Sequence, residues 1–448
     1  MKSARPKVLH EVAGRPLIHH VLHAASVLAP TTTTIVVGHQ ADAVREALAP
    51  RPGLGFVVQE PQLGTAHALL MAEPALAGKH GTVILLSGDV PLLRQETLRN
   101  LAAQHANSRA GATVITAVVE RPFGYGRIVR SGGQMARIVE EKDATPEERG
   151  ITEINSGIYA FALEGLFDAV RGIAAENAQR EYYLPDLIGI FRSQGRPVGT
   201  VTVDSADEIL GINSREELAV VNQIVWRAKN SALMAAGVTI DDPASTYVHQ
   251  DVQIGADTVL RPGVSLERGT RIGTGCEIHS GARNVNSTVG DHSTVLNHSL
   301  ITDSTIGSGV SVGPFAHLRG GASVGDGAKV GNFVELKKTA LGAGSKSMHL
   351  AYLGDAVIGE KVNIGAGTIT CNFDGERKQV TTIEDGAFIG SDSQLIAPVT
   401  IGKDAYVGTG TTVRENVPGG SLAVSAGKQR NIEGWVEQKR RRRKEAAE

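Results

Sequence analysis

Hydrophobic residues follow two different spacings along the chain. In the first part, short apolar runs such as TTIVVGH (33–39) and TVILLSGDVPLL (82–93) alternate with helical patterns such as RQETLRNLAAQH (94–105). Strands that alternate with helices indicate a parallel sheet covered on both faces. We therefore predict an α/β domain up to about residue 213.

A single long helix is predicted to follow this domain. Apolar residues recur at helical spacing, and Ser214 with Glu217 makes the capping-box pattern that starts a helix. The apolar stripe indicates packing against neighbouring elements rather than a cofactor site. The predicted organisation is a domain at 1–213, a linker helix at 214–236 and a second domain at 237–448.

From about residue 250 onward, aliphatic residues recur every six positions. Small residues fill the intervals, and Gly or Asp commonly follows the aliphatic one. This period fits neither an amphipathic helix nor isolated hairpins, and it is a signature of parallel β-helices, whose stacked coils share one aliphatic column. The runs that carry it extend from Ile254 to Ile278, from Ile306 to Leu336 and from Ile383 to Val413.

The interval KKTALGAGSKSMHLAYLGDA (337–356) lacks the strict repeat, and we predict a loop there that forms a site. It contains Lys337, His349 and Tyr352. Arg319 lies 18 residues before Lys337, so coils of that length would stack the two cations, which suits a phosphate. A histidine beside them suits a general base.

Charge and cysteine content narrow the function classes. The formal net charge is −2 and the pI is about 6.7, which argues against a nucleic-acid-binding surface over the whole protein. The basic run at 439–444 is more typical of a solvated tail than of a nucleic-acid or membrane arm. Two cysteines give no disulfide framework and fit a reducing cytoplasm. We expect no signal peptide and no membrane span.

Motifs in both parts of the chain resemble one family, the bacterial bifunctional N-acetylglucosamine-1-phosphate uridylyltransferases/glucosamine-1-phosphate acetyltransferases. They are PKVLH, QLGTAHA, SGDVPLL, GYGRIV, VEEKDA and EINSGIYAF, then VGNFVELKK, HLAYLGDA, NIGAGTITCNFDG and GSDSQLIAPVTIG. The resemblance implies a Rossmann-like nucleotidyltransferase domain, a left-handed parallel β-helix and a homotrimer.

The implied chemistry has two steps. Acetyl-CoA first acetylates the amine of glucosamine 1-phosphate. The phosphate of the resulting N-acetylglucosamine 1-phosphate then attacks the α-phosphate of UTP, with Mg²⁺ bound, to give UDP-N-acetylglucosamine and pyrophosphate. The resemblance further implies that this product feeds peptidoglycan and lipopolysaccharide synthesis.

The acetyltransferase residues of the family match positions in the second domain. His349 matches the general base, Arg319 and Lys337 the sugar-phosphate clamp, and the sugar contacts are Tyr352 and Asn363. The acetyl-CoA positions are Ala366, Asn372, Phe373, Ser391, Thr409 and Ala426. Three of these depart from the family pattern, where many members have Tyr, Ala and Arg at Phe373, Thr409 and Ala426. Lys428 or Arg430 could replace the missing cation.

The uridylyltransferase residues match positions in the first domain. Asp89 follows an apolar run, at the end of a strand where ligands bind in open α/β sheets. It matches one Mg²⁺ ligand and Asn213 the other, and oxygen ligands suit this ion. Lys7 matches a phosphate contact. The loop that reads the uracil base is matched by Gln59, Gly64 and Thr65, and the sugar pocket by Gly126, Glu140 and Asn155. The other matched substrate-binding positions are Ser87 and Gly88.

The start of the chain departs from the family pattern. Members begin with a strand and a Gly-rich loop, L-A-A-G-x-G-T-R, directly before the stretch that here opens MKSARPKVLH. Two explanations stay open, an internal methionine taken as the start, which we favour, and a real truncation. The alternatives to a bifunctional enzyme are therefore a monofunctional acetyltransferase and, in another class, a β-helix that serves only assembly or regulation.

Overall fold

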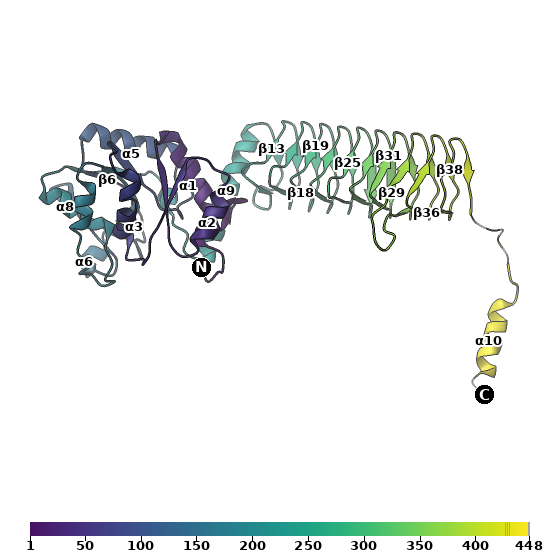
Figure 1. Cartoon of the computed structure of the whole chain (residues 1–448), viewed down its shortest axis with the longest axis horizontal. Coiled ribbons are helices and arrows are strands. Elements are labelled where there is room, and N and C mark those ends of the chain that lie inside the picture. Colours follow the sequence, from purple (N-terminus) through teal and green to yellow (C-terminus); the bar gives the residue numbers. More distant parts are fainter. Residues whose placement is uncertain (426, 428, 430, 447–448) are drawn as a thin grey trace. The chain divides into compact units, whose positions relative to one another are not determined.

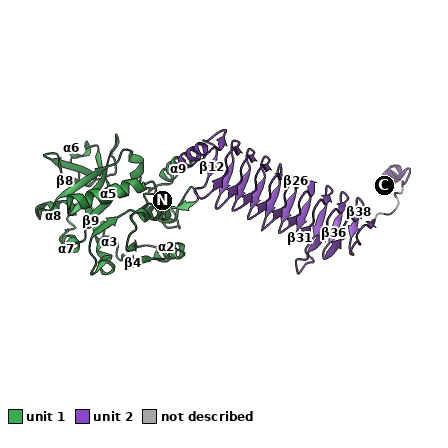
Figure 2. Ribbon diagram, turned by 90° about the horizontal axis from the view of Figure 1, so that it is seen from above, with its two compact units in different colours: residues 1–226 green, residues 227–448 purple. Residues whose placement is uncertain are grey.

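A computed structural model describes residues 1–425, 427, 429 and 431–446. The chain forms two compact units, Met1–Trp226 and Arg227–Glu448 (Figure 2). Helix α9 (Arg215–Ala235) contains the boundary between them. It starts with the expected capping box, because the Glu217 amide donates to Ser214 Oγ at 3.0 Å and the Ser214 amide donates to the Glu217 carboxylate at 2.8 Å.

The first unit is built on a six-stranded mixed sheet (Figure 1). Its strand order is β10-β6-β9-β7-β8, and β5 also pairs with β9. A separate parallel pair is formed by β3 (Thr33–Val37) and β4 (Leu54–Val58). The strands of the large sheet are β5 (Thr82–Leu85), β6 (Ala112–Val118), β7 (Arg127–Ser131), β8 (Gln134–Val139), β9 (Glu153–Ala162) and β10 (Val198–Thr202).

The expectation of a parallel sheet was wrong for most strands of the large sheet. Only β10 pairs with β6 in parallel, whereas β9 runs antiparallel to β5, β6 and β7. The two-residue turn Gly132–Gly133, with φ of +58° and +81°, reverses the chain between β7 and β8. Apolar runs mark buried strands but carry no information on their direction, so the sequence pattern could not reveal this.

The large sheet is covered on both faces, as predicted. Along β9, Tyr159 and Phe161 enter one buried cluster, while Ile158 and Ala160 enter another, as the two-residue period of a strand requires. The helices of this unit are α1 (Leu17–Ala25), α2 (Ala41–Leu48), α3 (Thr65–Met71), α4 (Glu73–Leu76), α5 (Gln95–Ser108), α6 (Pro146–Arg149), α7 (Leu166–Arg171) and α8 (Leu187–Ser193), with 3₁₀ turns η1 (Lys7–Leu9), η2 (Ser26–Leu28), η3 (Leu184–Asp186) and η4 (Ala206–Ile209).

The second unit confirms the parallel β-helix (Figure 1). Among the described residues, three parallel sheets form its sides, with 11, 10 and 9 strands. We name them by their first and last strands: the β11–β40 sheet (Thr239–Ile240 to Leu422–Ala423), the β12–β39 sheet (Tyr247–Val248 to Thr412–Val413) and the β13–β37 sheet (Gln253–Ile254 to Val399–Ile401). The aliphatic residues of the three predicted runs form one continuous core, with only Ile254 partly buried.

The predicted loop at 337–356 was wrong, because the coils continue through it. The buried column passes from Leu336 to Leu341, Ser347, Leu353 and Ile358. Steps of five residues and a serine in place of an aliphatic residue hide the period there. A loop that does leave the stack lies at 372–380, between β33 (Ile369–Cys371) and β34 (Thr381–Ile383), and projects in the yellow-green part of Figure 1.

The basic run lies on a separate helix, α10 (Trp435–Glu445), whose described residues are all exposed. Across the described part of the chain, no helix is both long and apolar enough to cross a membrane.

Candidate functional site

One corner of the β-helix carries the predicted general base and three predicted acetyl-CoA positions. In the β11–β40 sheet, Val330, Ser347, Ile364, Ile389 and Val407 are paired in register on successive coils. The residues two positions further on therefore follow one another along a corner, with coils about 4.8 Å apart. We call this row the His349 corner; it consists of Asn332, His349, Ala366, Ser391 and Thr409.

Within this corner, His349 is oriented by a residue of the preceding coil. Its Nδ1 lies 2.8 Å from Oδ1 of Asn332, and the two residues are in register at the ends of β26 (Lys329–Asn332) and β29 (Lys346–His349). Since an amide oxygen only accepts, in the neutral ring Nδ1 carries the proton and Nε2 has the lone pair. His349 is exposed, so the lone pair is accessible to a substrate.

The adjacent β12–β39 sheet brings Arg319 and Lys337 together. They are paired in register at the ends of β24 (His317–Arg319) and β27 (Glu335–Lys337), as an 18-residue coil predicts. Glu335 holds the guanidinium, with Nε of Arg319 at 2.7 Å from its Oε1. Asp355 faces the ammonium, with 3.9 Å between its Oδ2 and Nζ of Lys337. Two cations on neighbouring coils are thus held in place by two carboxylates.

Tyr352 and Asn372 converge beside this pair of cations. A Cβ on Gly354 would lie 2.5 Å from the Tyr352 hydroxyl and 2.8 Å from Nδ2 of Asn372, so a side chain there would displace these two groups. The side-chain amide of Asn372 also donates to the Asp355 carboxylate. Because that carboxylate faces Lys337, it connects Asn372 with Lys337. These contacts make one polar cluster on the outer side of the sheet.

The remaining predicted acetyltransferase residues lie on neighbouring coils. Asn363, on β32 (Asn363–Ile364), is in register with Lys346 and Phe388. Phe373 lies in the projecting loop, is 56% exposed, and has Nζ of Lys378 at 5.0 Å from its ring centre. Ala426 and its suggested substitutes Lys428 and Arg430 lie outside the described residues.

In the first unit, the predicted metal ligands meet at a single cation. Nζ of Lys7 donates to Oδ1 of Asn213 at 2.5 Å and forms an ion pair with Asp89. The turn that carries Asn213 is tied to the end of β5, because the Ile212 amide donates to the Asp89 carbonyl at 3.1 Å. A carboxylate and an amide oxygen that share one ammonium also fit a hard divalent cation, which prefers such ligands. No group of three or more His, Cys, Asp or Glu residues suited to a metal occurs in the described part of the chain.

Side chains of the loop predicted to read the base form one hydrogen bond within the loop and one to Leu184. Nε2 of Gln59 donates to the Gly64 carbonyl at 2.9 Å, and Thr65 Oγ1 accepts from the Leu184 amide at 3.3 Å. Gly64 has φ of +103°, and a Cβ there would lie 2.7 Å from the Tyr182 carbonyl oxygen. Glycine is therefore required at this position.

The residues predicted for the sugar pocket form a second group. The backbone N–H of Asn155 donates to the Gly126 carbonyl at 2.9 Å, and a Cβ on Gly126 would lie 3.2 Å from Oε1 of Glu140. Asn155 Oδ1 accepts from the buried Tyr159 hydroxyl at 3.0 Å. Burial raises the pKa of Glu140, and the negative charge of Asp143 adds to this effect.

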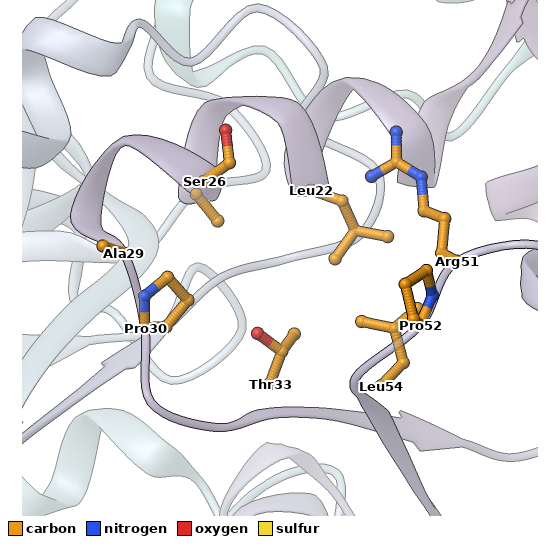
Figure 3. A pocket seen from close by; sticks show the side chains of 9 residues that line it. Leu22, Ser26, Ala29, Pro30, Thr33, Arg51, Pro52 and Leu54 are labelled. Atoms are coloured by element: carbon orange, nitrogen blue, oxygen red, sulfur yellow. The ribbon is translucent and has the colours of Figure 1, made fainter.

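Ser87 and Gly88 connect these groups to β5. A Cβ on Gly88 would lie 3.2 Å from Cγ1 of Val8, so the glycine lets the turn that carries Lys7 approach closely. Ser87 Oγ lies beside Gly157, within β9. A separate hollow of about 480 Å³ between α1, β3 and β4 contains none of the predicted site residues (Figure 3).

Sequence reasoning missed the side chains that hold the site residues. These are Asn332 beside His349, Glu335 beside Arg319, and Asp355 between Lys337 and Asn372. Each lies about one coil from its partner in sequence, but the coils that carry these residues vary between 17 and 18 residues. An offset of one coil is therefore the signal that could have found them.

Comparisons with known proteins agree with this two-part architecture. Residues 1–181 match the MobA-like NTP transferase domain, residues 240–330 the GMPPB C-terminal domain, and residues 381–415 the bacterial transferase hexapeptide (six repeats). The apo UDP-glucose pyrophosphorylase crystal structure covers 50% of this chain at a TM-score of 0.42 and 15% identity, a likeness too distant to bear on function.

Whole-chain relatives decide the family. The bifunctional protein GlmU of Trichlorobacter lovleyi is 48% identical over 441 residues, which cover 98% of this chain and 96% of that protein. The chain belongs to the GlmU family of bifunctional proteins. GlmU of Pelobacter propionicus is 48% identical over 97% of this chain and 95% of its own length, and GlmU of Halalkalibacterium halodurans is 46% identical over 98% and 96%.

Both units of the chain therefore have counterparts in GlmU proteins. This confirms the interpretation as a bifunctional acetyltransferase and uridylyltransferase over that of a β-helix used only for assembly.

Proposed function

We propose that this chain acetylates glucosamine 1-phosphate with acetyl-CoA at the β-helix and transfers uridylyl from UTP to N-acetylglucosamine 1-phosphate in the first unit. The observation that carries the proposal is the His349 corner, where a histidine with a free Nε2 is followed, coil by coil, by Ala366, Ser391 and Thr409. A long, thin cofactor such as acetyl-CoA can extend along such a row with its thioester beside the histidine.

In the acetyl transfer, Nε2 of His349 accepts the proton that the amine loses as its nitrogen bonds to the acetyl carbon. The attacking amine must already be neutral, because an ammonium has no lone pair, and the general base removes the proton that becomes acidic once the nitrogen has bonded to the acetyl carbon. The bond from that carbon to sulfur then breaks, and the imidazolium returns the proton to the departing thiolate. Asn332 fixes the tautomer throughout. Asn372 and Ser391 are the groups we propose to donate to the acetyl carbonyl or the cofactor.

The phosphate of glucosamine 1-phosphate is proposed to bind between Arg319 and Lys337. Their guanidinium and ammonium lie on adjacent coils, and each already faces a carboxylate, from Glu335 and Asp355. Those carboxylates position the cations without burying them, so a doubly charged phosphate can compete for both. Tyr352 and Asn363 are the proposed contacts to the sugar.

For uridylyl transfer, we propose that Asp89 and Asn213 hold Mg²⁺ and that Lys7 contacts a phosphate. When bound, the ion would neutralise charge on the phosphates of UTP. The convergence of both oxygens on the Lys7 ammonium supports a cation at this point. Gln59, Gly64 and Thr65, with Ser87 and Gly88 nearby, would face the nucleotide, and the sugar would lie against Gly126, Glu140 and Asn155.

We infer that the second unit assembles as a homotrimer. An exposed apolar row supports this, since His298, Phe315 and Phe333 stack on successive coils with ring centres 5.3 and 5.4 Å apart. The two phenylalanines are 47% and 55% exposed and have positive φ, which costs roughly 1 kcal/mol or more for a bulky residue. Exposed apolar rows of this kind are typical of protein interfaces.

The test is an assay of both reactions on one preparation. With glucosamine 1-phosphate, acetyl-CoA, UTP and Mg²⁺, we expect release of CoA thiol and of pyrophosphate. Release of CoA alone would support a monofunctional acetyltransferase instead, and release of neither would contradict the proposal.

A further inference from the structure

An irregular segment of the first unit is folded by one side chain. This strap, residues 177–184, connects the region after α7 to η3. Oδ1 of Asn177 accepts from the amides of Gln179 and Glu181, each at 3.2 Å, and its Nδ2 donates to the Glu181 carbonyl at 2.6 Å. Only an amide side chain offers an acceptor and a donor in this arrangement.

One side of the strap clamps the loop predicted to read the base. The Tyr182 amide donates to the Leu63 carbonyl at 2.9 Å, and the Tyr182 carbonyl accepts from the Ala66 amide at 3.0 Å. The strap backbone lies so close to Gly64 that any side chain there would clash with it. The position of this loop therefore depends on the position of the strap.

The other contacts of the strap reach the turn that carries Glu140. The Ala178 amide donates to Oδ1 of Asp143 at 3.1 Å, and the Asp143 amide donates to the Glu140 carbonyl at 3.0 Å. Burial, followed by the charges of Asp143 and Glu140, raises the pKa of Tyr183 to about 12, in keeping with a strap packed against these carboxylates.

We propose that Asn177 is a positioning residue, which folds the strap so that the base-reading loop at Gly64 and the sugar-side turn at Glu140 are held in one fixed relation. Binding of the nucleotide and of the sugar phosphate then depend on the same side chain, although it contacts neither. The inference rests on the proposed uridylyl transfer and adds to it a shared determinant of base and sugar recognition.

Two substitutions remove the hydrogen bonds of Asn177 completely or in part. Asn177→Ala removes all three hydrogen bonds, whereas Asn177→Asp keeps the acceptor but replaces the donor to the Glu181 carbonyl with a second acceptor oxygen. Since about 1.4 kcal/mol corresponds to a tenfold change in affinity, the loss of these hydrogen bonds should make UDP-N-acetylglucosamine bind roughly 10- to 100-fold more weakly to the alanine variant. The aspartate variant should recover part of this loss.

The experiment is calorimetric titration of the full chain with UDP-N-acetylglucosamine, UTP, CTP and N-acetylglucosamine 1-phosphate. Asn107→Ala, at an exposed position of α5, is the matched control. We expect Asn177→Ala to bind UTP and the sugar phosphate more weakly and to lose several-fold in its preference for UTP over CTP, with unchanged melting temperature and CoA release.

Three results would overturn the inference: wild-type affinities in Asn177→Ala, weakening of one ligand only, or losses that follow a lowered melting temperature with the UTP preference intact. If the unsubstituted chain binds no uridine ligand at all, the proposed uridylyl transfer fails and the inference fails with it. Binding by the unsubstituted chain that Asn177→Ala leaves unchanged rejects the inference alone.

Discussion

His349 Nδ1 lies 2.8 Å from Oδ1 of Asn332, one coil away on the same corner of the β-helix. This contact decides which ring nitrogen is free. It also explains how an exposed histidine can have a defined orientation without a buried partner, since a neighbouring coil of the same rigid stack supplies the hydrogen bond.

The first prediction concerns Asn332. Asn332→Leu removes one hydrogen bond to the imidazole and should lower the rate of acetyl transfer on the order of tenfold, because such a bond contributes about 1 kcal/mol. Asn332→Asp should move the acid limb of the pH–rate profile to higher pH, since a carboxylate favours the protonated ring. A pH profile of CoA release measures both effects, and an unshifted limb in the aspartate variant would reject this role.

The second prediction concerns the phosphate clamp. Lys337→Ala should raise KM for glucosamine 1-phosphate about 10- to 100-fold, because a charge-assisted hydrogen bond is worth roughly 1.5–3 kcal/mol. KM for acetyl-CoA should stay the same. Lys403→Ala, an exposed lysine on a later coil, is the control. Steady-state kinetics with each substrate varied in turn measures both KM values. Equal changes in the two would reject the role of Lys337 in binding the phosphate.

The third prediction concerns the cation site of the first unit. Asp89→Asn should lower pyrophosphate release about a hundredfold or more, as is usual when a charged group at a phosphoryl-transfer site is lost. The Mg²⁺ concentration needed for half-maximal activity of this variant should rise. Asp42→Asn, on an exposed carboxylate of α2, controls for the change in charge. Unchanged Mg²⁺ dependence would mean that Asp89 is no ligand.

The fourth prediction concerns pH and stability. Burial raises the pKa of Glu140 above its ordinary value of 4.5, so the native state favours the protonated carboxyl. Its contribution to stability is therefore complete below about pH 4.5 and is lost as the pH rises through the raised pKa. The glutamine of Glu140→Gln cannot ionise. The melting temperature of this variant should therefore rise relative to that of the unsubstituted chain as the pH increases from 4.5 to 8.

The control for this prediction is Glu120→Gln, at an exposed glutamate after β6. Its melting temperature should stay parallel to that of the unsubstituted chain across the same pH range. A Glu140→Gln curve that also stays parallel would show that ionisation of this carboxyl does not oppose folding.

The β-helix was predictable from sequence because buried aliphatic residues such as Leu260 and Leu395 recur at the spacing of its repeat. The register of Arg319 with Lys337 followed from the same arithmetic. Strand direction in the first unit did not follow, since a buried strand such as β9 has the same composition in either direction. The false loop around His349 arose because Ser347 occupies a core position that the aliphatic pattern does not recognise.

The supporting side chains were hidden for a different reason. Asn332, Glu335 and Asp355 act across coils, and a shift of one residue in coil length changes which side chains meet. Sequence spacing fixes the coil only to within that residue. The contacts among these side chains therefore required the structure.

The most direct test of the account is to measure both reactions in His349→Ala and in Asp89→Ala. We expect His349→Ala to lose CoA release by roughly 100- to 10,000-fold, the usual range for a general base, and to keep pyrophosphate release from UTP and N-acetylglucosamine 1-phosphate. Asp89→Ala should show the reverse. Loss of both activities in either variant, or normal CoA release by His349→Ala, would contradict two separate sites with these residues at their centres.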